Sequence, residues 1–182
     1  MLVTADAIAQ RAAENMIVSL FEQYQRPIFA YLLRLVGDRE WAEELAQETF
    51  LAAFRAADQL PGIANHRAWL YRIATNAALN ALKRRRRFAW LPWLKVDDYR
   101  LDADDPIGAV ARRDAVERAL LALPPAQRAA LLLYSHYGLS VSEVAGALEI
   151  EPGAVKTRLY RARILFREAY EREVRDENPR RD

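Results

Sequence analysis

Apolar residues recur every three or four positions along most of the chain, which is the spacing of one face of an α-helix. The first such segment covers about 20–35 and ends before Gly37. A second segment, at about 38–57, carries apolar residues on one side and Glu and Gln on the opposite side. A third and longer segment runs over about 66–87. The spacing therefore predicts three packed helices in the first half of the chain.

The helical spacing stops after the third segment. Residues 88–108 contain two Pro and five Asp and show no helical period, which predicts a linker and a domain boundary. Four helical segments with short connections follow, at about 110–123, 124–137, 140–148 and 152–173. The expected fold class is therefore all-α, with two small helical domains joined by a linker.

The domain limits follow from these breaks. We expect an N-terminal extension at 1–17, a first domain at 18–90, a linker at 91–112, a second domain at 113–175 and a tail at 176–182. The tail is polar, as the frayed end of a domain usually is.

A helix-turn-helix is predicted in the second domain. Ser140 and Glu143 have the spacing of a capping box that opens a short helix, and Pro152 suits the first turn of the helix that follows. In that following helix the apolar residues share one stripe, while Lys, Thr, Tyr and Arg point the other way. A helix-turn-helix places such a face in the major groove of DNA. An ordinary helix pair with a solvated basic face would give the same pattern, so both interpretations stay open on this motif alone.

Composition narrows the class of protein. The 182 residues contain no Cys and only two His, which excludes disulfides and thiolate ligands and leaves no basis for a metal site. No apolar run is long enough to span a membrane, and the charged N-terminal residues do not form a signal peptide, so we expect a cytoplasmic protein without membrane insertion. No nucleophile, catalytic carboxylate pair or Gly-rich phosphate loop is apparent, so we expect neither an enzyme nor a bound cofactor.

The net charge of +2 conceals a strong segregation of charge along the chain. Residues 59–96 carry eight bases and no acid, and residues 152–167 carry five bases and no acid. The segments 1–58 and 97–150 each carry nine acids and five bases. Clustered cations bind polyanions by releasing counterions, so the pattern indicates contact with nucleic acid at two places. Solvated helix faces also produce charge runs and are the alternative interpretation.

The stretch that begins at Trp69 is the most specific in the chain. Asn76, Asn80 and Lys83 share one stripe of the predicted helix with Arg72, beside its main apolar side, and a run of five bases ends the helix. Asn side chains beside bases and aromatics suit the capture of an unstacked base, and the basic run suits backbone phosphates. The alternative is that the Asn residues are solvated and that the basic run complements the helix dipole.

These motifs occur together in an order that resembles the extracytoplasmic-function (ECF) sigma factors of the sigma-70 family. The resemblance to their second domain rests on Tyr24-x-x-Pro27, Gly37-Asp38, the acidic run 42–50 and the run from Trp69 to Asn76. The resemblance to their fourth domain rests on Leu123-Pro124-x-x-x-Arg128, Gly138-Leu139-Ser140 and the run 153–163. Together the two parts cover about 18–87 and 113–172.

The resemblance implies a subunit that brings the RNA polymerase core to a promoter, reads the duplex −35 element and opens the −10 element as a single strand. The residues that it implies for core polymerase binding are Glu44, Leu45, Gln47 and Glu48. Those that it implies for −10 DNA, together with the loop 61–68, are Arg67, Asn76, Asn80, Lys83 and Arg84. Those that it implies for −35 DNA are Lys156, Thr157, Arg158, Tyr160 and Arg161. Members of this family are commonly held by an anti-sigma factor, which is a further expected partner, although no residue here identifies one.

Three positions depart from the family pattern: Trp41, Asn80, and Glu149 at the turn of the helix-turn-helix, where Gly is usual. Two rival functions also stay open. A stand-alone helix-turn-helix regulator would bind duplex DNA without polymerase, but it does not account for the acidic helix or for the motif that begins at Trp69. A helical adaptor would bind only proteins and would show no salt-dependent DNA binding.

Overall fold

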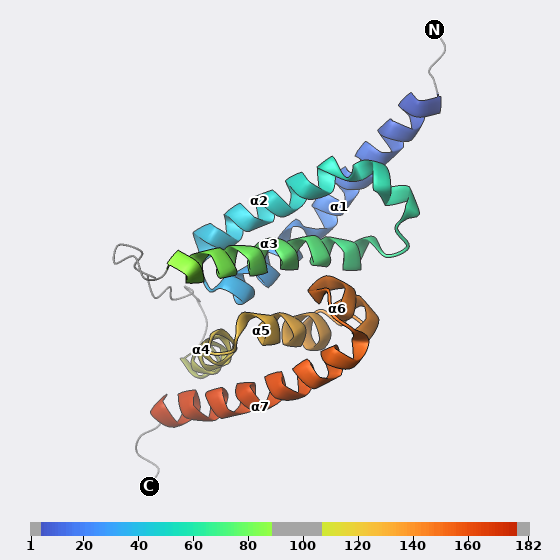
Figure 1. Ribbon diagram of the computed structural model, residues 1–182. Helices are drawn as coiled ribbons and strands as arrows, with labels where there is room; N and C mark the ends of the chain where they lie inside the picture. The colour runs from blue at the N-terminus through green and yellow to red at the C-terminus, as the bar shows by residue number, and fades with distance from the viewer. Residues whose placement is uncertain (1–4, 89–106, 178–182) are drawn as a thin grey trace.

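The structure is a computed structural model that describes residues 5–88 and 107–177. Throughout these two ranges the regular elements are helices, and they form two domains, one above the other in Figure 1, so the expected all-α class is confirmed. The first domain contains α1 (Ala5–Val36), α2 (Arg39–Arg55), η1 (Ala57–Gly62) and α3 (His66–Phe88). The second contains α4 (Ile107–Leu121), α5 (Pro125–Leu131), η2 (Leu132–His136), α6 (Val141–Leu148) and α7 (Pro152–Glu177).

The sharp reversal between α1 and α2 is encoded in two residues. Gly37 has a φ of +76°, which favours glycine, and a Cβ at this position would lie 2.6 Å from a methyl group of Leu121. Asp38 then caps α2, because its carboxylate accepts a hydrogen bond of 2.9 Å from the backbone N–H of Trp41. The reversal brings Leu45 of α2 into the core that α1 and α3 share.

The starts of two helices, α1 and α4, differ from those that the apolar pattern predicts. Helix α1 begins at Ala5, so residues 5–17 of the expected extension are helical, and the first turns of α1 project beyond α2 and α3 (Figure 1). Such turns need no apolar stripe, which is why the spacing did not predict them. Residues 107–112 of the expected linker form the start of α4, while the segment 89–106, with its Trp and Pro residues, lies outside the described residues.

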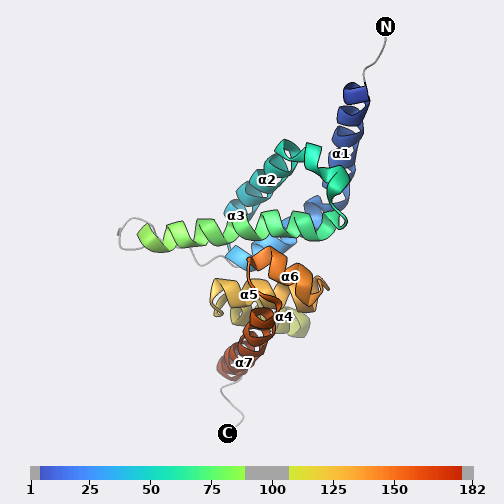
Figure 2. The ribbon, with the colours of Figure 1, turned by 45° about the vertical axis from the view of Figure 1, so that its right-hand side comes forward.

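The second domain is built around α7, against which α4, α5 and α6 pack (Figures 1 and 2). The pattern predicted one helix over 124–137, but the structure has α5 followed by η2, a turn of π-helix. In η2 the N–H of Tyr137 donates to the carbonyl of Leu132 at 3.0 Å, five residues back. A π turn accommodates an extra residue within a helix and keeps the apolar spacing nearly intact, so the spacing does not reveal it.

A buried arginine joins the two domains. Arg128 on α5 is only 6% exposed, and its guanidinium donates to the carbonyl oxygens of Leu35 at 2.7 Å, Leu121 at 2.6 Å and Leu123 at 2.9 Å. Carbonyls at helix ends have no partner within their own helix, and here one cation serves the end of α1 and the end of α4. Burial lowers the pKa of Arg128 to about 10, so the group keeps its charge at neutral pH.

We expect Arg128→Ala to lower the free energy of unfolding by about 3 kcal/mol, because it leaves carbonyls of both domains buried without a donor. Urea unfolding followed by circular dichroism measures the change. Arg26→Ala, at an exposed position of α1, is the control and should change the value by less than about 0.5 kcal/mol. An equal effect of the two substitutions would contradict the bridging role of Arg128.

Candidate nucleic-acid interface

Helix α7 separates a buried side from an exposed side, as the helical spacing predicts. Val155, Leu159 and Ala162 are at most 4% exposed, whereas Tyr160 is 67% exposed. Exposed or half-buried side chains are found at all five positions predicted to read duplex DNA: Lys156, Thr157, Arg158, Tyr160 and Arg161. These groups are hydrogen-bond donors and an aromatic ring, which suit base edges and phosphates.

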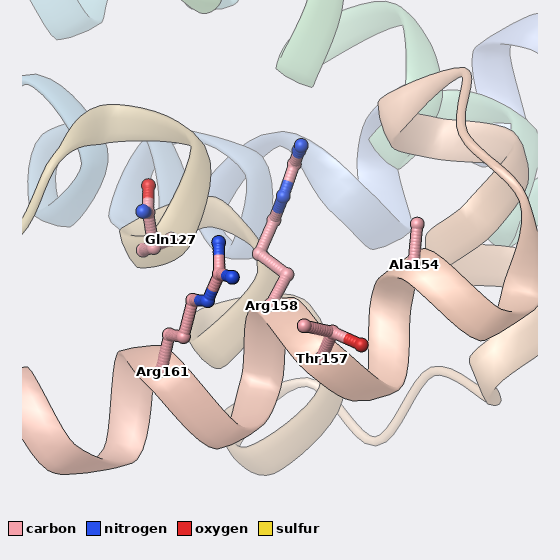
Figure 3. Close-up of a pocket in the computed structure, with 5 residues that line it drawn as sticks. All are labelled: Gln127, Ala154, Thr157, Arg158 and Arg161. Carbon is pink, nitrogen blue, oxygen red and sulfur yellow. The ribbon is translucent and has the colours of Figure 1, made fainter.

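A depression of about 320 Å³ lies between α5 and α7 (Figure 3). Figure 3 shows the side chains of Arg158 and Arg161 extending from α7 toward the side on which α5 carries Gln127. Two guanidinium groups at one opening suit an anion such as phosphate. The sequence did not single out Gln127, because only the packing of α5 on α7 brings it to this face.

The two helices of the helix-turn-helix are fixed by local hydrogen bonds. The predicted capping box is confirmed: the N–H of Glu143 donates to Ser140 Oγ at 3.2 Å, and the N–H of Ser140 donates to the Glu143 carboxylate at 2.6 Å. Glu149 ends α6 with φ 54° and ψ 46°, the left-handed conformation that usually falls to glycine. Glu149 thus ends α6 and begins the short connection, through Ile150 and Glu151, to α7.

At the basic end of α3, Arg85 packs against the neighbouring helix α2, while the other bases are exposed to solvent. Arg85 is half-buried; its guanidinium lies 4.9 Å from the ring of Trp41 and 4.0 Å from the carboxylate of Asp38. Trp41 therefore has a packing role, as a platform for a cation from the neighbouring helix. Three residues predicted to contact −10 DNA remain exposed on α3: Asn80, Lys83 and Arg84.

The other two residues predicted for −10 DNA, Asn76 and Arg67, contact the second domain. Asn76 donates from its side-chain amide to the Glu149 carboxylate at 3.0 Å. Arg67 donates to the backbone carbonyl of Tyr137, which follows η2, and its guanidinium also lies over the ring of Tyr71. Both groups are half-buried, so part of the predicted DNA surface is turned toward α6 in this arrangement.

Three tyrosines meet beneath these contacts. The ring of Tyr137 lies 5.4 Å from that of Tyr31 and 5.0 Å from that of Tyr71, and the latter two are at most 1% exposed. Thr75 donates its proton to the Tyr71 carbonyl at 2.6 Å, so the Tyr31 hydroxyl is the donor in its 2.8 Å bond to Thr75. Burial raises the pKa of all three phenols, which are therefore neutral and serve packing.

Helix α2 presents an acidic side to solvent. Of the four residues predicted to bind core polymerase, Glu44, Gln47 and Glu48 are exposed, while Leu45 is 2% exposed and packs in the core. The structure therefore does not present the Leu45 side chain to a partner. Two apolar side chains of α2 are also exposed, Leu51 at 55% and Phe54 at 56%. Exposed apolar groups beside carboxylates are typical of a protein-binding surface.

No group of three potential metal ligands occurs in the described part of the chain. Among its helices, none combines the length and the apolar character needed to cross a membrane.

The fold and the basic face of α7 define a two-domain, all-helical helix-turn-helix protein. Residues 20–88 match sigma-70 region 2, and residues 113–165 match sigma-70 region 4. The chain is 32% identical to the RNA polymerase sigma-H factor of Pseudomonas aeruginosa, over 85% of this chain and 86% of that protein. It is 32% identical to the ECF RNA polymerase sigma factor SigM of Mycobacterium tuberculosis, over 79% of this chain and 71% of that protein. The chain belongs to the ECF sigma factors of the sigma-70 family.

Other relatives are longer than this chain. The match to the ECF sigma factor SigE of Mycolicibacterium smegmatis has 34% identity and spans 65% of that protein, and the match to SigG of Mycobacterium tuberculosis spans 45%. The fold is also that of the sigma factor RpoE in its co-crystal structure with the anti-sigma factor NepR from Bartonella quintana. The TM-score is 0.72 at 22% identity, over 84% of this chain and 95% of the RpoE chain. The structure of CnrH in complex with the cytosolic domain of CnrY matches with a TM-score of 0.62 at 26% identity. The match covers 92% of this chain and 98% of the chain in that structure.

We expect Ser140→Ala to lower the free energy of unfolding by about 1 kcal/mol, because it removes the acceptor that caps α6. Thermal or urea unfolding of the full chain measures the loss. Ser142→Ala, an exposed position in the same turn, is the matched control and should change the value by less than about 0.5 kcal/mol. A larger loss for Ser142→Ala than for Ser140→Ala would contradict the capping role.

Proposed function

We propose that this chain is an RNA polymerase sigma subunit that directs the polymerase to promoters and takes part in opening them. It acts by binding, without catalysis of its own, in the cytoplasm, where polymerase and chromosome meet. One observation carries the proposal: two helical domains of one chain each expose a basic face, and a third, acidic face lies apart from both. A stand-alone duplex-binding regulator needs only one of these faces.

In this function α7 reads the duplex −35 element. Arg158 and Arg161 can donate to guanine edges or phosphates, and the depression beside Gln127 offers room for a phosphate at the edge of the groove. Thr157 and Tyr160 supply a hydroxyl, a methyl and a ring for adaptable contacts. Helix α7 packs against α4, α5 and α6, so these side chains project from a helix that is already formed before DNA binds.

Helix α3 takes the −10 element as a single strand. Asn76 and Asn80 carry amides that match base edges, and Lys83 and Arg84 lie further along the same helix for the phosphates. Arg67 precedes them at the first turn of α3. Capture of unstacked bases offsets the free energy lost when the duplex opens, so binding alone is enough to drive melting.

Helix α2 docks on the polymerase core. Glu44, Gln47 and Glu48 provide the polar part of this surface, and Leu51 and Phe54 provide the apolar part. A second proposed partner is an anti-sigma factor, because the sigma factor RpoE, which shares this fold, is bound to the anti-sigma factor NepR in its structure.

Transcription in vitro tests the proposed function. Bacterial core polymerase is supplied with a promoter library, with and without this chain, and the transcript starts are sequenced. Initiation that depends on the chain and that shares a −35 and −10 pair is the expected result. Absence of any complex between the chain and the core would overturn the proposal, and stable operator binding by the chain alone would favour the regulator.

We expect Glu44→Lys to weaken binding to core polymerase by at least about tenfold, because it reverses a charge at the centre of the acidic side of α2. Affinity is measured by titration of labelled chain with core polymerase. Glu171→Lys, an exposed position on α7, makes the same charge change far from α2 and should leave the affinity within about twofold. Unchanged binding by Glu44→Lys would remove α2 from the polymerase interface.

A further inference from the structure

The two domains meet through α3 and α6, which lie against each other in both views (Figures 1 and 2). Side chains of the first domain donate three hydrogen bonds to acceptors of the second. The pairs are Asn65 with the Glu143 carboxylate, Arg67 with the Tyr137 carbonyl, and Asn76 with the Glu149 carboxylate. All three acceptors are oxygen atoms, two of them anionic, like the groups that DNA offers.

We propose that the free chain closes on itself and that the closed form withholds the start of α3 from single-stranded DNA, with Glu149 as the latch. This inference rests on the proposed function, since it concerns the surface assigned there to −10 DNA. In the closed form the Glu149 carboxylate holds the amide of Asn76 that a base would need. Asn80, Lys83 and Arg84 stay exposed, so closure engages one of the two amides assigned to bases, that of Asn76, and leaves Asn80 and the phosphate-binding residues open.

The backbone conformation of Glu149 indicates that its side chain has a role. A φ of 54° is uncommon for a residue with a Cβ, and glycine would fit this helix end without that cost. Residues in strained conformations cluster at functional sites, and within the described residues the polar contact of this side chain across the domains is with Asn76. The latch therefore accounts for a glutamate at a position that otherwise favours glycine.

Tyr137 seals the same interface. Its ring contacts the rings of Tyr31 and Tyr71, which belong to the first domain and are buried. Opening would expose these rings, so the closed form is favoured in water until a partner takes over the surface. The hydrogen bonds themselves are each modest, and loss of one would shift an equilibrium between closed and open forms by roughly three- to tenfold.

The experiment uses the full chain, which contains no cysteine and so accepts two specific labels. Gln59→Cys and Glu171→Cys, both at exposed positions, carry a fluorescent pair, one label on each domain. Energy transfer is compared in the parent chain, Glu149→Gly and Tyr137→Ala. Glu151→Gly is the matched control, because it removes the same side chain and charge two residues away, at an exposed position with no contact across the domains in the described structure. Glu149→Gly should remain folded, since glycine suits a positive φ.

We expect energy transfer to fall in Glu149→Gly and Tyr137→Ala and to stay at the parent value in Glu151→Gly. Affinity for the single-stranded −10 strand of a promoter selected in the transcription assay should rise by roughly three- to tenfold in Glu149→Gly and by less than twofold in the control. Equal transfer in Glu149→Gly and the parent chain would overturn the latch. Reduced transfer without a gain in single-strand affinity would overturn the withholding of α3.

Failure of the proposed function gives a different result. In that case neither the parent chain nor Glu149→Gly supports initiation, whatever the energy transfer shows. Failure of the latch alone leaves initiation intact in both chains, with no difference in energy transfer between them.

Discussion

One buried guanidinium determines how the two halves of this protein sit together. Arg128 belongs to the second domain, but it donates to the last turn of α1 as well as to the end of α4. A buried charge is costly unless several acceptors surround it, and helix-end carbonyls are acceptors that nothing else satisfies. With α5 beside the end of α1, η2 and α6 lie over α3 in the closed form. The contacts of Tyr137 and Glu149 depend on this placement.

The sequence was sufficient for the parts of the fold that repeat with the helical period. The faces of α7, the capping box at Ser140 and the break before α2 all follow from spacing and from residue chemistry that acts within a few positions. The extent of α1 and the π turn of η2 did not follow, because neither disturbs the apolar spacing enough to be seen. The same spacing places Leu45 on the apolar side of α2 and so predicts its burial. The family resemblance instead assigned this residue to polymerase binding.

The pairing of the two domains could not be derived from the sequence. Asn76 and Glu149 lie on helices whose periods are independent, so no local pattern relates them. The one local indication was Glu149, a glutamate at a turn that favours glycine. It could be interpreted only after the structure showed its contact with Asn76. The same chemistry explains both states of the α3 surface, because amides and guanidinium groups that suit the oxygen atoms of DNA suit carboxylates and peptide carbonyls equally well. Helix α2, whose acidic side stays exposed, is meanwhile available to a partner.

The π turn of η2 makes the contacts of Tyr137 with the first domain sensitive to the deletion of a single residue. A π turn differs from an α-helical turn by one inserted residue. Deletion of a single codon within 132–136 would restore an ordinary helix and rotate Tyr137 by about 100° about its axis, away from Tyr31 and Tyr71. The aromatic contact between the two domains therefore depends on a single inserted residue in a helix that otherwise serves the core of the second domain.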